Sequence, residues 1–298
     1  MTGDRWRLSA FGDEIADSLE DQCRALAEHG VGLVELRSAW GTNVGDFDSA
    51  LCDRALGVLR DFDIGVSAIG SPLGKVPAQE PPDEEQPRLE RCLEAAERLG
   101  TRLVRVFSYY VLGQYEPMRD TVLRRLEAMA EAARRRDLVL VLENESWIYG
   151  DLPERCVDVL RSVDSPALRF AFDPANFVQC GADPMEAWPL LRPYVAHVHI
   201  KDAVPVDRAG LEPYPAPVPH DRLMDSVRPA GEGAGRIPEL VQALAAEGYQ
   251  GILTLEPHLA GRLPDADGAE RFGVAVAALR KVVTDAGLES GVDVGGSR

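Results

Sequence analysis

Short apolar runs alternate with longer amphipathic stretches along the whole chain. Eight runs have the length and the β-branched content of buried strands: residues 6–11, 32–37, 64–69, 102–108, 138–143, 168–173, 195–200 and 252–256. Apolar positions recur at helical spacing after each of them, and we expect helices at about residues 17–29, 47–62, 83–99, 117–136, 151–163, 183–192, 236–248 and 268–287.

Start and stop signals support several of these helices. Asp151 followed by Pro153, and Asp183 followed by Pro184, are typical of a helix N-terminus, where a carboxylate accepts free N–H groups and proline suits the first turn. Gly100 follows a predicted helix, and glycine readily adopts the left-handed conformation that ends one.

A strand–helix unit repeated eight times predicts a single α/β domain. Eight such units favour a parallel sheet closed into a (β/α)8 TIM barrel, covering residues 1–288. An open, doubly wound sheet is the alternative, but no GxGxxG or GxxxxGK loop follows the first strand.

Three segments interrupt the repeat or follow it. Residues 70–87 form a Pro-rich loop after the third strand, and residues 203–235 form a long Pro-rich loop after the seventh. Structureless connections of that length are uncommon unless they work as lids or contact arms. We favour a lid for residues 203–235, with a mobile surface insertion as the alternative, and expect residues 289–298 to be a disordered tail.

Four predicted strands end in side chains that can bind a metal. The run 138-LVLVLE-143 ends at Glu143, 168-LRFAFD-173 at Asp173 and 252-ILTLE-256 at Glu256, while 195-VAHVHI-200 carries His199. A parallel barrel brings these ends together at one mouth, and three carboxylates are too much negative charge to bury there without a cation. The alternative is that each acid caps a helix or pairs with an arginine.

The alternation of side chains along a strand places small or branched residues beneath the four ends. Ala171 should lie beneath Asp173 and Thr254 beneath Glu256. The same alternation turns His197 and Arg169 inward, and both then need polar partners inside the barrel.

Composition narrows the classes of function. The 298 residues carry a formal net charge of −17, whereas nucleic-acid binding draws on clustered Lys and Arg, so we expect no nucleic-acid partner. Five widely spaced cysteines without a CxxC pair indicate reduced, structural thiols. The sequence shows no signal peptide and no run of roughly 18 apolar residues, so we expect a cytoplasmic protein with no membrane partner.

Several motifs together resemble a known family. They are 142-LEN-144, 172-FDPANF-177, 197-HVHIKD-202, 231-GEGAG-235 and 248-GYQGILTLEPH-258. The chain is similar to the xylose isomerase-like TIM barrel superfamily of sugar phosphate isomerases and epimerases, which is related to endonuclease IV. The resemblance implies that Glu143, Asp173, His199 and Glu256 bind the metal, the same four residues that the strand ends select.

The resemblance also implies a reaction. One divalent ion, expected to be Mn²⁺ with Mg²⁺, Co²⁺ or Zn²⁺ as alternatives, would chelate a carbonyl and its neighbouring hydroxyl and stabilise an enediolate. Glu143 and Glu256 would be the catalytic acid–base groups. We therefore expect an isomerase or epimerase acting on a small sugar, keto-polyol or sugar phosphate. A lyase of the same superfamily, eliminating from a keto-sugar, keto-inositol or oxidised glycoside (C-glycosides included), is the alternative.

Five further residues are expected to bind substrate: Arg37, Asn176, Lys201, Glu232 and His258. Some sugar epimerases of the family carry His at the position of Asn176. Glu35 is expected to pair internally with Arg37, and Lys75, Glu145 and Trp147 are weaker candidates near the mouth.

Two other classes of function are disfavoured. A nuclease like endonuclease IV needs additional His ligands, and this chain has five His in total. A catalytically inactive barrel is disfavoured because the four ligands are intact. The expected partner is a small-molecule carbohydrate, and the sequence leaves open whether the chain forms a homo-oligomer.

Overall fold

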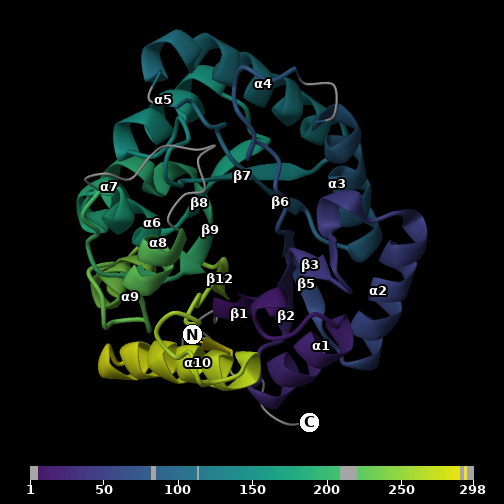
Figure 1. Cartoon of the computed structure of the whole chain (residues 1–298), viewed down its shortest axis with the longest axis vertical. Coiled ribbons are helices and arrows are strands. Elements are labelled where there is room, and N and C mark those ends of the chain that lie inside the picture. The colour runs from purple at the N-terminus through teal and green to yellow at the C-terminus, as the bar shows by residue number, and fades with distance from the viewer. Residues whose placement is uncertain (1–5, 82–84, 113, 209–219, 289–291, 294–298) are drawn as a thin grey trace.

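Eight strands pair in parallel around a closed ring in the computed structural model (Figure 1). The structure describes residues 6–81, 85–112, 114–208, 220–288 and 292–293. The ring strands are β1 Trp6–Phe11, β2 Leu33–Leu36, β5 Gly65–Ile69, β6 Leu103–Val106, β7 Val139–Glu143, β8 Leu168–Phe172, β9 Val195–Ile200 and β12 Ile252–Leu255. Pairing of β1 with β12 closes the ring, with Arg7 opposite Ile252 and Ala10 opposite Leu255. The predicted TIM barrel is confirmed.

Helices form an outer ring around the strands (Figure 1). They are α1 Leu19–Glu28, α2 Ser49–Asp61, α3 Glu85–Leu99, α4 Tyr115–Arg135, α5 Pro153–Val163, α7 Pro184–Leu191, α9 Ile237–Ala246 and α10 Gly268–Asp285. Each amphipathic helix turns its apolar side to the strands, so one continuous core lies between the two rings. α10 lies between α9 and α1 and completes the outer ring.

Of the two aspartates expected at helix N-termini, one caps its helix and the other does not, although both helices begin at the expected proline. Asp183 caps α7 by accepting from the Met185 N–H, as expected. Asp151 is not the cap of α5: Leu152 holds that position, and the Asp151 carboxylate binds Arg155 and the Tyr115 hydroxyl instead. A charged partner one turn along the helix competes successfully with the free backbone N–H groups.

Short elements at the strand ends were not predicted. They are the helices α6 Pro174–Gln179 and α8 His220–Ser226, the 3-10 helices η1 Gly12–Glu14, η2 Val44–Asp46 and η3 Arg192–Tyr194, and the strands β3 Ser38–Ala39, β4 Thr42–Asn43, β10 Asp202–Ala203, β11 Val227–Arg228 and β13 Val292–Asp293. Elements this short contain too few turns or alternations to show a period. Most of them lie in the loops at the C-terminal mouth of the barrel, whereas η3 directly precedes β9 and β13 pairs with the start of β1, at the opposite end.

The described part of the segment 203–235 contains regular structure. β10 pairs antiparallel with β11, and α8 lies between them in sequence, so the described part is not a structureless loop. Residues 209–219 lie outside the described part. Gln179 donates to the Leu223 carbonyl and to the Ser226 hydroxyl, which fixes α8 to α6 beside the mouth.

Asp202 explains the GEGAG motif. Its buried carboxylate accepts the N–H groups of Gly231, Gly233 and Gly235 at 2.9, 3.0 and 2.7 Å. A Cβ atom at Gly233 would lie 2.3 Å from Asp202 Oδ1, so only glycine fits there. The two ends of the 203–235 segment are thereby joined through one side chain.

Three further expectations concern the thiols, membranes and the tail. The cysteines are free, and burial raises the pKa of Cys23, Cys92 and Cys180 to about 12, which suits inert structural thiols.

None of the described helices is both long and apolar enough to cross a membrane. Of the expected disordered tail, Val292–Asp293 instead pair with Trp6–Arg7 as β13. For residues 289–291 and 294–298, which lie outside the described ranges, disorder stays a prediction.

Candidate metal centre

Four buried side chains converge at the C-terminal mouth of the barrel. Glu143 ends β7, Asp173 follows β8, His199 lies on β9 and Glu256 follows β12. One possible ligand atom from each lies within 4.8 Å of the others. The predicted convergence of the four strand ends is thus what the fold produces, and it follows from the alternation that buries Ala171 and Thr254 one layer below.

The two carboxylate oxygens of Asp173 have different partners: one caps a helix and the other faces the cluster. Oδ1 caps α6 by accepting from the Asn176 N–H at 2.9 Å. Oδ2 accepts no hydrogen bond within the described structure and lies 2.7 Å from Lys201 Nζ. Asn144 fixes the backbone here by bonding both the carbonyl and the N–H of Asp173. The helix-cap alternative is therefore also true, but it uses one oxygen and leaves the other for the cluster.

Glu143 is held by a buried arginine on its outer oxygen. Arg105 Nη1 lies 3.1 Å from Glu143 Oε2. The other oxygen, Oε1, accepts from Asn176 Nδ2 at 3.2 Å and lies 3.5 Å from His199 Nδ1. One oxygen is thus neutralised by an arginine while the second faces the cluster.

Glu256 repeats the arrangement. Its Oε1 accepts from Arg37 Nη1 and lies 3.2 Å from His258 Nε2. Its Oε2 lies 3.1 Å from Lys201 Nζ and 3.7 Å from His199 Nδ1. Pairing with arginine, which was the alternative to metal binding, again takes only one of the two oxygens.

The neighbouring cations keep two of the acids charged. Burial alone would raise the pKa of Glu143, but Arg105 and His199 outweigh burial and hold it at about 2. Burial is likewise outweighed at Glu256, where Lys201 and His258 hold the pKa well below its usual range. Asp173 differs: burial raises its pKa to about 6 despite Lys201, with Glu143 and Glu256 adding to the rise.

The cluster fits a divalent cation. His199 Nδ1 is buried, has no hydrogen-bond partner among the described residues and faces the shared space, and beside it Asp173 Oδ2 has only its ion pair with Lys201. A buried polar atom normally has a partner, and a cation would supply one to His199 Nδ1. Three carboxylates and one imidazole nitrogen are ligands that Mn²⁺, Mg²⁺, Co²⁺ or Zn²⁺ accept.

A pocket of about 190 Å³ opens over the cluster. Glu143 and Glu256 line it, as do Asn176, Lys201, His258 and Arg37. Four of the five residues expected to bind substrate therefore lie where a substrate would be. The fifth, Glu232, does not: it is exposed and lines a different pocket beside α10, because the glycines around it turn inward to Asp202. Larger pockets lie on the outer surface, away from the three acids and the imidazole of the cluster.

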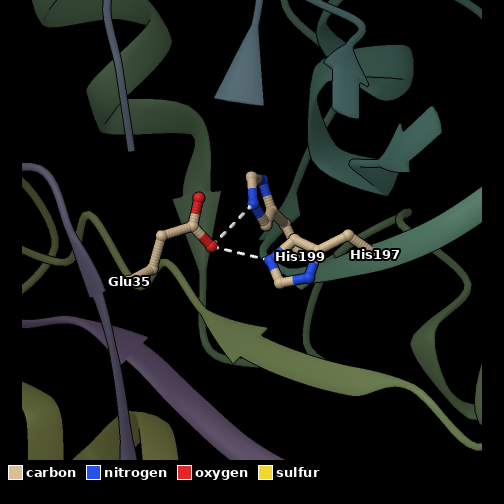
Figure 2. Close-up of side chains that lie close together, drawn as sticks. All are labelled: Glu35, His197 and His199. Atoms are coloured by element: carbon tan, nitrogen blue, oxygen red, sulfur yellow. Dashed lines mark hydrogen bonds and ion pairs between the residues drawn. The ribbon is translucent and has the colours of Figure 1, made fainter. Parts of the chain in front are cut away.

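The expected pair between Glu35 and Arg37 is wrong. Glu35 Oε2 lies 2.7 Å from His197 Nε2 and 3.3 Å from His199 Nε2 (Figure 2). Arg37 binds Asp13 and Glu256. Both side chains point inward from β2, but they meet different layers of the barrel. His197 thus has the buried polar partner it needed, whereas Arg169 finds its partner, the Pro193 carbonyl, at an exposed position.

Seven residues that line the pocket were not foreseen: Asn43, Gly70, Pro72, Arg105, Gln179, Leu223 and Met224. Arg105 lines the pocket from β6, and Leu223 and Met224 reach it from α8. Arg105 had a signal, since it is the charged residue within the apolar run 103-LVRV-106. Lys75 and Glu145 also line the pocket and pair with each other at 3.1 Å, while Trp147 packs against Arg208.

The sequence is similar to known proteins over most of its length. A 3-dehydroshikimate dehydratase from Bacillus anthracis is 23% identical over 206 residues, which cover 64% of this chain and 68% of that protein. Among solved structures, the IOLI protein with a binding zinc atom has a TM-score of 0.76 at 15% identity, covering 94% of this chain and 98% of its own. A D-tagatose 3-epimerase-like protein has a TM-score of 0.69 at 17% identity, covering 94% and 99%.

The structural similarities, at such low identity, establish a shared fold. Family membership rests on the sequence itself, because residues 23–282 match the family described as Xylose isomerase-like TIM barrel. With this match and the closed barrel in agreement, the chain belongs to the Xylose isomerase-like TIM barrel family.

Proposed function

We propose that this protein is a divalent-cation-dependent isomerase or epimerase that moves a proton on the carbon beside a carbonyl group of a small sugar, keto-polyol or sugar phosphate. The observation that carries the proposal is the cluster of Glu143, Asp173, His199 and Glu256 beneath a pocket. The epimerase-like protein with the same fold supports the reaction class. When bound, the cation would hold the carbonyl oxygen and stabilise the negative charge that develops there.

Glu143 and Glu256 are the proton-transfer groups in this proposal. Their low pKa values keep both as carboxylates, which is the form that accepts a proton. They enter the pocket from β7 and β12, so a substrate between them meets one base on each side. A proton weakly held by such a carboxyl returns readily to the substrate, as isomerisation and epimerisation require.

Lys201 would contribute charge without moving a proton. It is buried, and although burial lowers the pKa of an ammonium, Asp173 and Glu256 raise the pKa of Lys201 well above its usual value. It therefore stays protonated at the base of the pocket, where it can stabilise an oxygen that becomes negative. Asn176 orients Glu143 through the amide hydrogen bond.

A lyase reaction is the second candidate, and His258 favours it. His258 lines the pocket, and Glu14 and Glu256 raise its pKa although burial acts in the opposite direction. A protonated imidazole beside the base Glu256 can deliver a proton to a departing hydroxyl group. The dehydratase relative supports the same outcome.

Deuterium exchange and absorbance separate the two candidates. We expect the Mn²⁺-loaded protein, incubated in D₂O with a panel of ketoses, keto-polyols and their phosphates, to place deuterium next to the carbonyl of one class of substrate. A new conjugated-enone absorbance would assign the lyase reaction instead. The Glu143→Gln variant and the chelator-treated protein are the controls. Neither deuterium incorporation nor enone formation across the panel would contradict both candidates.

The metal, the compartment and the partners follow from the same proposal. We propose Mn²⁺ as the working cation, with Mg²⁺, Co²⁺ and Zn²⁺ as alternatives. We also propose that the protein acts in the cytoplasm, because buried thiols of raised pKa suit a reducing compartment. The proposed partner is the small-molecule substrate.

A further inference from the structure

Glu35, like Asp173, is an acid of this network that does not line the pocket over the cluster. Its side chain is fully buried, and it reaches across the barrel from β2 to β9. The register between β2 and β5 shifts between Val34 and Glu35, and such an irregularity re-aims the side chain that follows it. The result is a carboxylate placed among two histidines in the interior (Figure 2).

A single oxygen of Glu35 meets both histidines. Oε2 lies 2.7 Å from His197 Nε2 and 3.3 Å from His199 Nε2. The contact with His197 is a hydrogen bond, so that Nε2 carries the proton. The 3.3 Å contact with His199 does not meet hydrogen-bond geometry, but the negative charge of the carboxylate there favours the tautomer that has its proton on Nε2. A neutral His199 protonated at Nε2 has its free lone pair on Nδ1, and Nδ1 is the atom that faces Glu143 and Glu256.

Packing prevents the His199 ring from turning away. The Phe11 ring meets it edge-on with 5.3 Å between ring centroids, and the His197 ring does so at 5.2 Å. Thr254 Oγ1 lies 3.0 Å from His197 Nε2 and fixes that second ring.

We propose that Glu35 is a positioning residue for the metal centre: it fixes the tautomer and the orientation of His199 so that Nδ1 binds the cation, and His197 holds Glu35 in place. This inference rests on the cation site of the proposed function. A carboxylate behind a ligating histidine also makes the ring a stronger donor.

A second cation among Glu35, His197 and His199 is the competing interpretation, since their ligand atoms also lie close together. The 2.7 Å separation of Glu35 Oε2 and His197 Nε2 is that of a hydrogen bond. His199 would also have to bind two cations through its two nitrogens. With a single cation at Nδ1 of His199, the Glu35–His197 hydrogen bond is kept and His199 binds one cation only.

Metal affinity tests the proposal without any substrate. Dissociation constants for Mn²⁺ and Zn²⁺ are measured by competition with a chromophoric chelator for the full-length protein, Glu35→Ala, Glu35→Gln and Ser9→Ala. We expect Glu35→Ala to bind about 10- to 100-fold more weakly and the near-isosteric Glu35→Gln to fall between it and the parent. Ser9→Ala removes a buried barrel hydroxyl that bonds Ser67, and should bind like the parent.

A spectroscopic readout separates positioning from a loss of folding. In the zinc-loaded parent, long-range ¹H–¹⁵N NMR should show zinc at Nδ1 of His199 and a strongly downfield Nε2 proton. That proton should move upfield in Glu35→Gln, and unfolding curves of the metal-free variants establish that they are folded.

Three results would overturn the proposal. The first is unchanged affinity with an unchanged Nε2 signal in both Glu35 variants. The second is a stoichiometry of two cations per chain that falls to one in Glu35→Ala, because Glu35 would then be a ligand. The third is a parent protein that binds no divalent cation, which would also contradict the proposed function; in the first two cases that function stands.

Discussion

Lys201 Nζ lies 2.7 Å from Asp173 Oδ2, the carboxylate oxygen that faces the candidate cation position. The ammonium therefore competes with the cation for the same oxygen, while its charge remains available to the substrate. The other ligands show related pairings, because Arg105 holds Glu143 and Arg37 holds Glu256. A substitution of Lys201 should consequently change the affinity for the cation and the turnover rate in opposite directions.

We expect Lys201→Met to bind Mn²⁺ about tenfold more tightly and to turn over about 10²-fold more slowly. Even at an effective dielectric constant of about 20, an ammonium group next to the cation position raises the free energy of a bound divalent cation by more than about 1 kcal/mol. The slower turnover reflects the lost charge at the reacting oxygen. Chelator competition and steady-state rates measure the two effects.

Lys75→Met is the matched control for Lys201→Met. Lys75 also lines the pocket, but it pairs with Glu145 and not with a cluster residue. Its loss should change the Mn²⁺ affinity by no more than roughly twofold, as for other solvent-accessible pairs. Weaker Mn²⁺ binding by Lys201→Met would contradict the competition described above.

Removing either proposed base should abolish most turnover. We expect Glu143→Gln and Glu256→Gln each to lose at least about 10²-fold, the lower range for a missing acid–base group. Each substitution keeps one oxygen that can still face the cluster. Turnover is compared at cation concentrations that saturate each variant, so that weaker metal binding does not imitate the loss of a base. Near-normal turnover under those conditions would contradict the assignment.

The fold and the convergence of Glu143, Asp173, His199 and Glu256 could be predicted because they depend on local patterns. Alternation along one strand decides which side Glu143 faces, and the barrel then brings equivalent strand ends together. The partner of Glu35 could not be predicted in the same way, since β2 and β9 are separated by β1 and β12 in the sheet. Contacts across the barrel interior depend on layer and side-chain length, which a period of two residues does not specify.

Glu232 shows the same limit in a loop. Its motif was recognised, but glycines in the GEGAG turn serve the Asp202 carboxylate through backbone N–H groups. Because these hydrogen bonds come from backbone N–H groups, the only residue types in the turn that indicate them are the glycines. The turn therefore presents Glu232 to solvent.

A saturating cation should stabilise the folded protein. Binding to the native state alone adds about 2.7 kcal/mol to the free energy of unfolding when the cation is at about 100 times its dissociation constant. Urea unfolding of the parent with Mn²⁺ and with a chelator measures this difference. Asp173→Asn should lose most of it, because the amide cannot supply the negative Oδ2. Equal stabilisation of this variant would place the cation elsewhere.

Arg105 should determine how stability changes in acid. Glu143 has a folded-state pKa of about 2, below its usual value of 4.5, so it contributes stability above pH 4.5 that is lost as the pH falls toward 2. In Arg105→Met the folded-state pKa rises and this contribution disappears. The metal-free variant should be destabilised at pH 7 by about 3–5 kcal/mol, the effect of leaving a buried charge unpaired.

Urea unfolding of the metal-free parent and of Arg105→Met between pH 7 and pH 3 makes that comparison. The difference in stability between the two proteins should shrink as the pH falls, because Glu143 takes up a proton in the folded variant, where its pKa is raised, while Arg105 keeps it charged in the folded parent down to about pH 2. A difference that stays constant over the whole range would show that Arg105 acts through packing, on Phe11 and Phe107, and not through Glu143.

The three hydrogen bonds that join the Asp202 carboxylate to Gly231, Gly233 and Gly235, here called the Asp202 clasp, should not tolerate a methyl group added at Gly233. Gly233→Ala places a Cβ atom 2.3 Å from Asp202 Oδ1, so the turn must shift and at least one of the N–H bonds to the carboxylate is lost. We expect a loss of about 1–3 kcal/mol in the free energy of unfolding, as for other overpacked sites. Gly57→Ala, in the middle of α2 with no atom within 4 Å of the added carbon, should instead stabilise by about 0.5–1 kcal/mol. If α8 depends on the clasp for its place at the mouth, Gly233→Ala should also raise the KM for substrate, whereas Gly57→Ala should leave it unchanged.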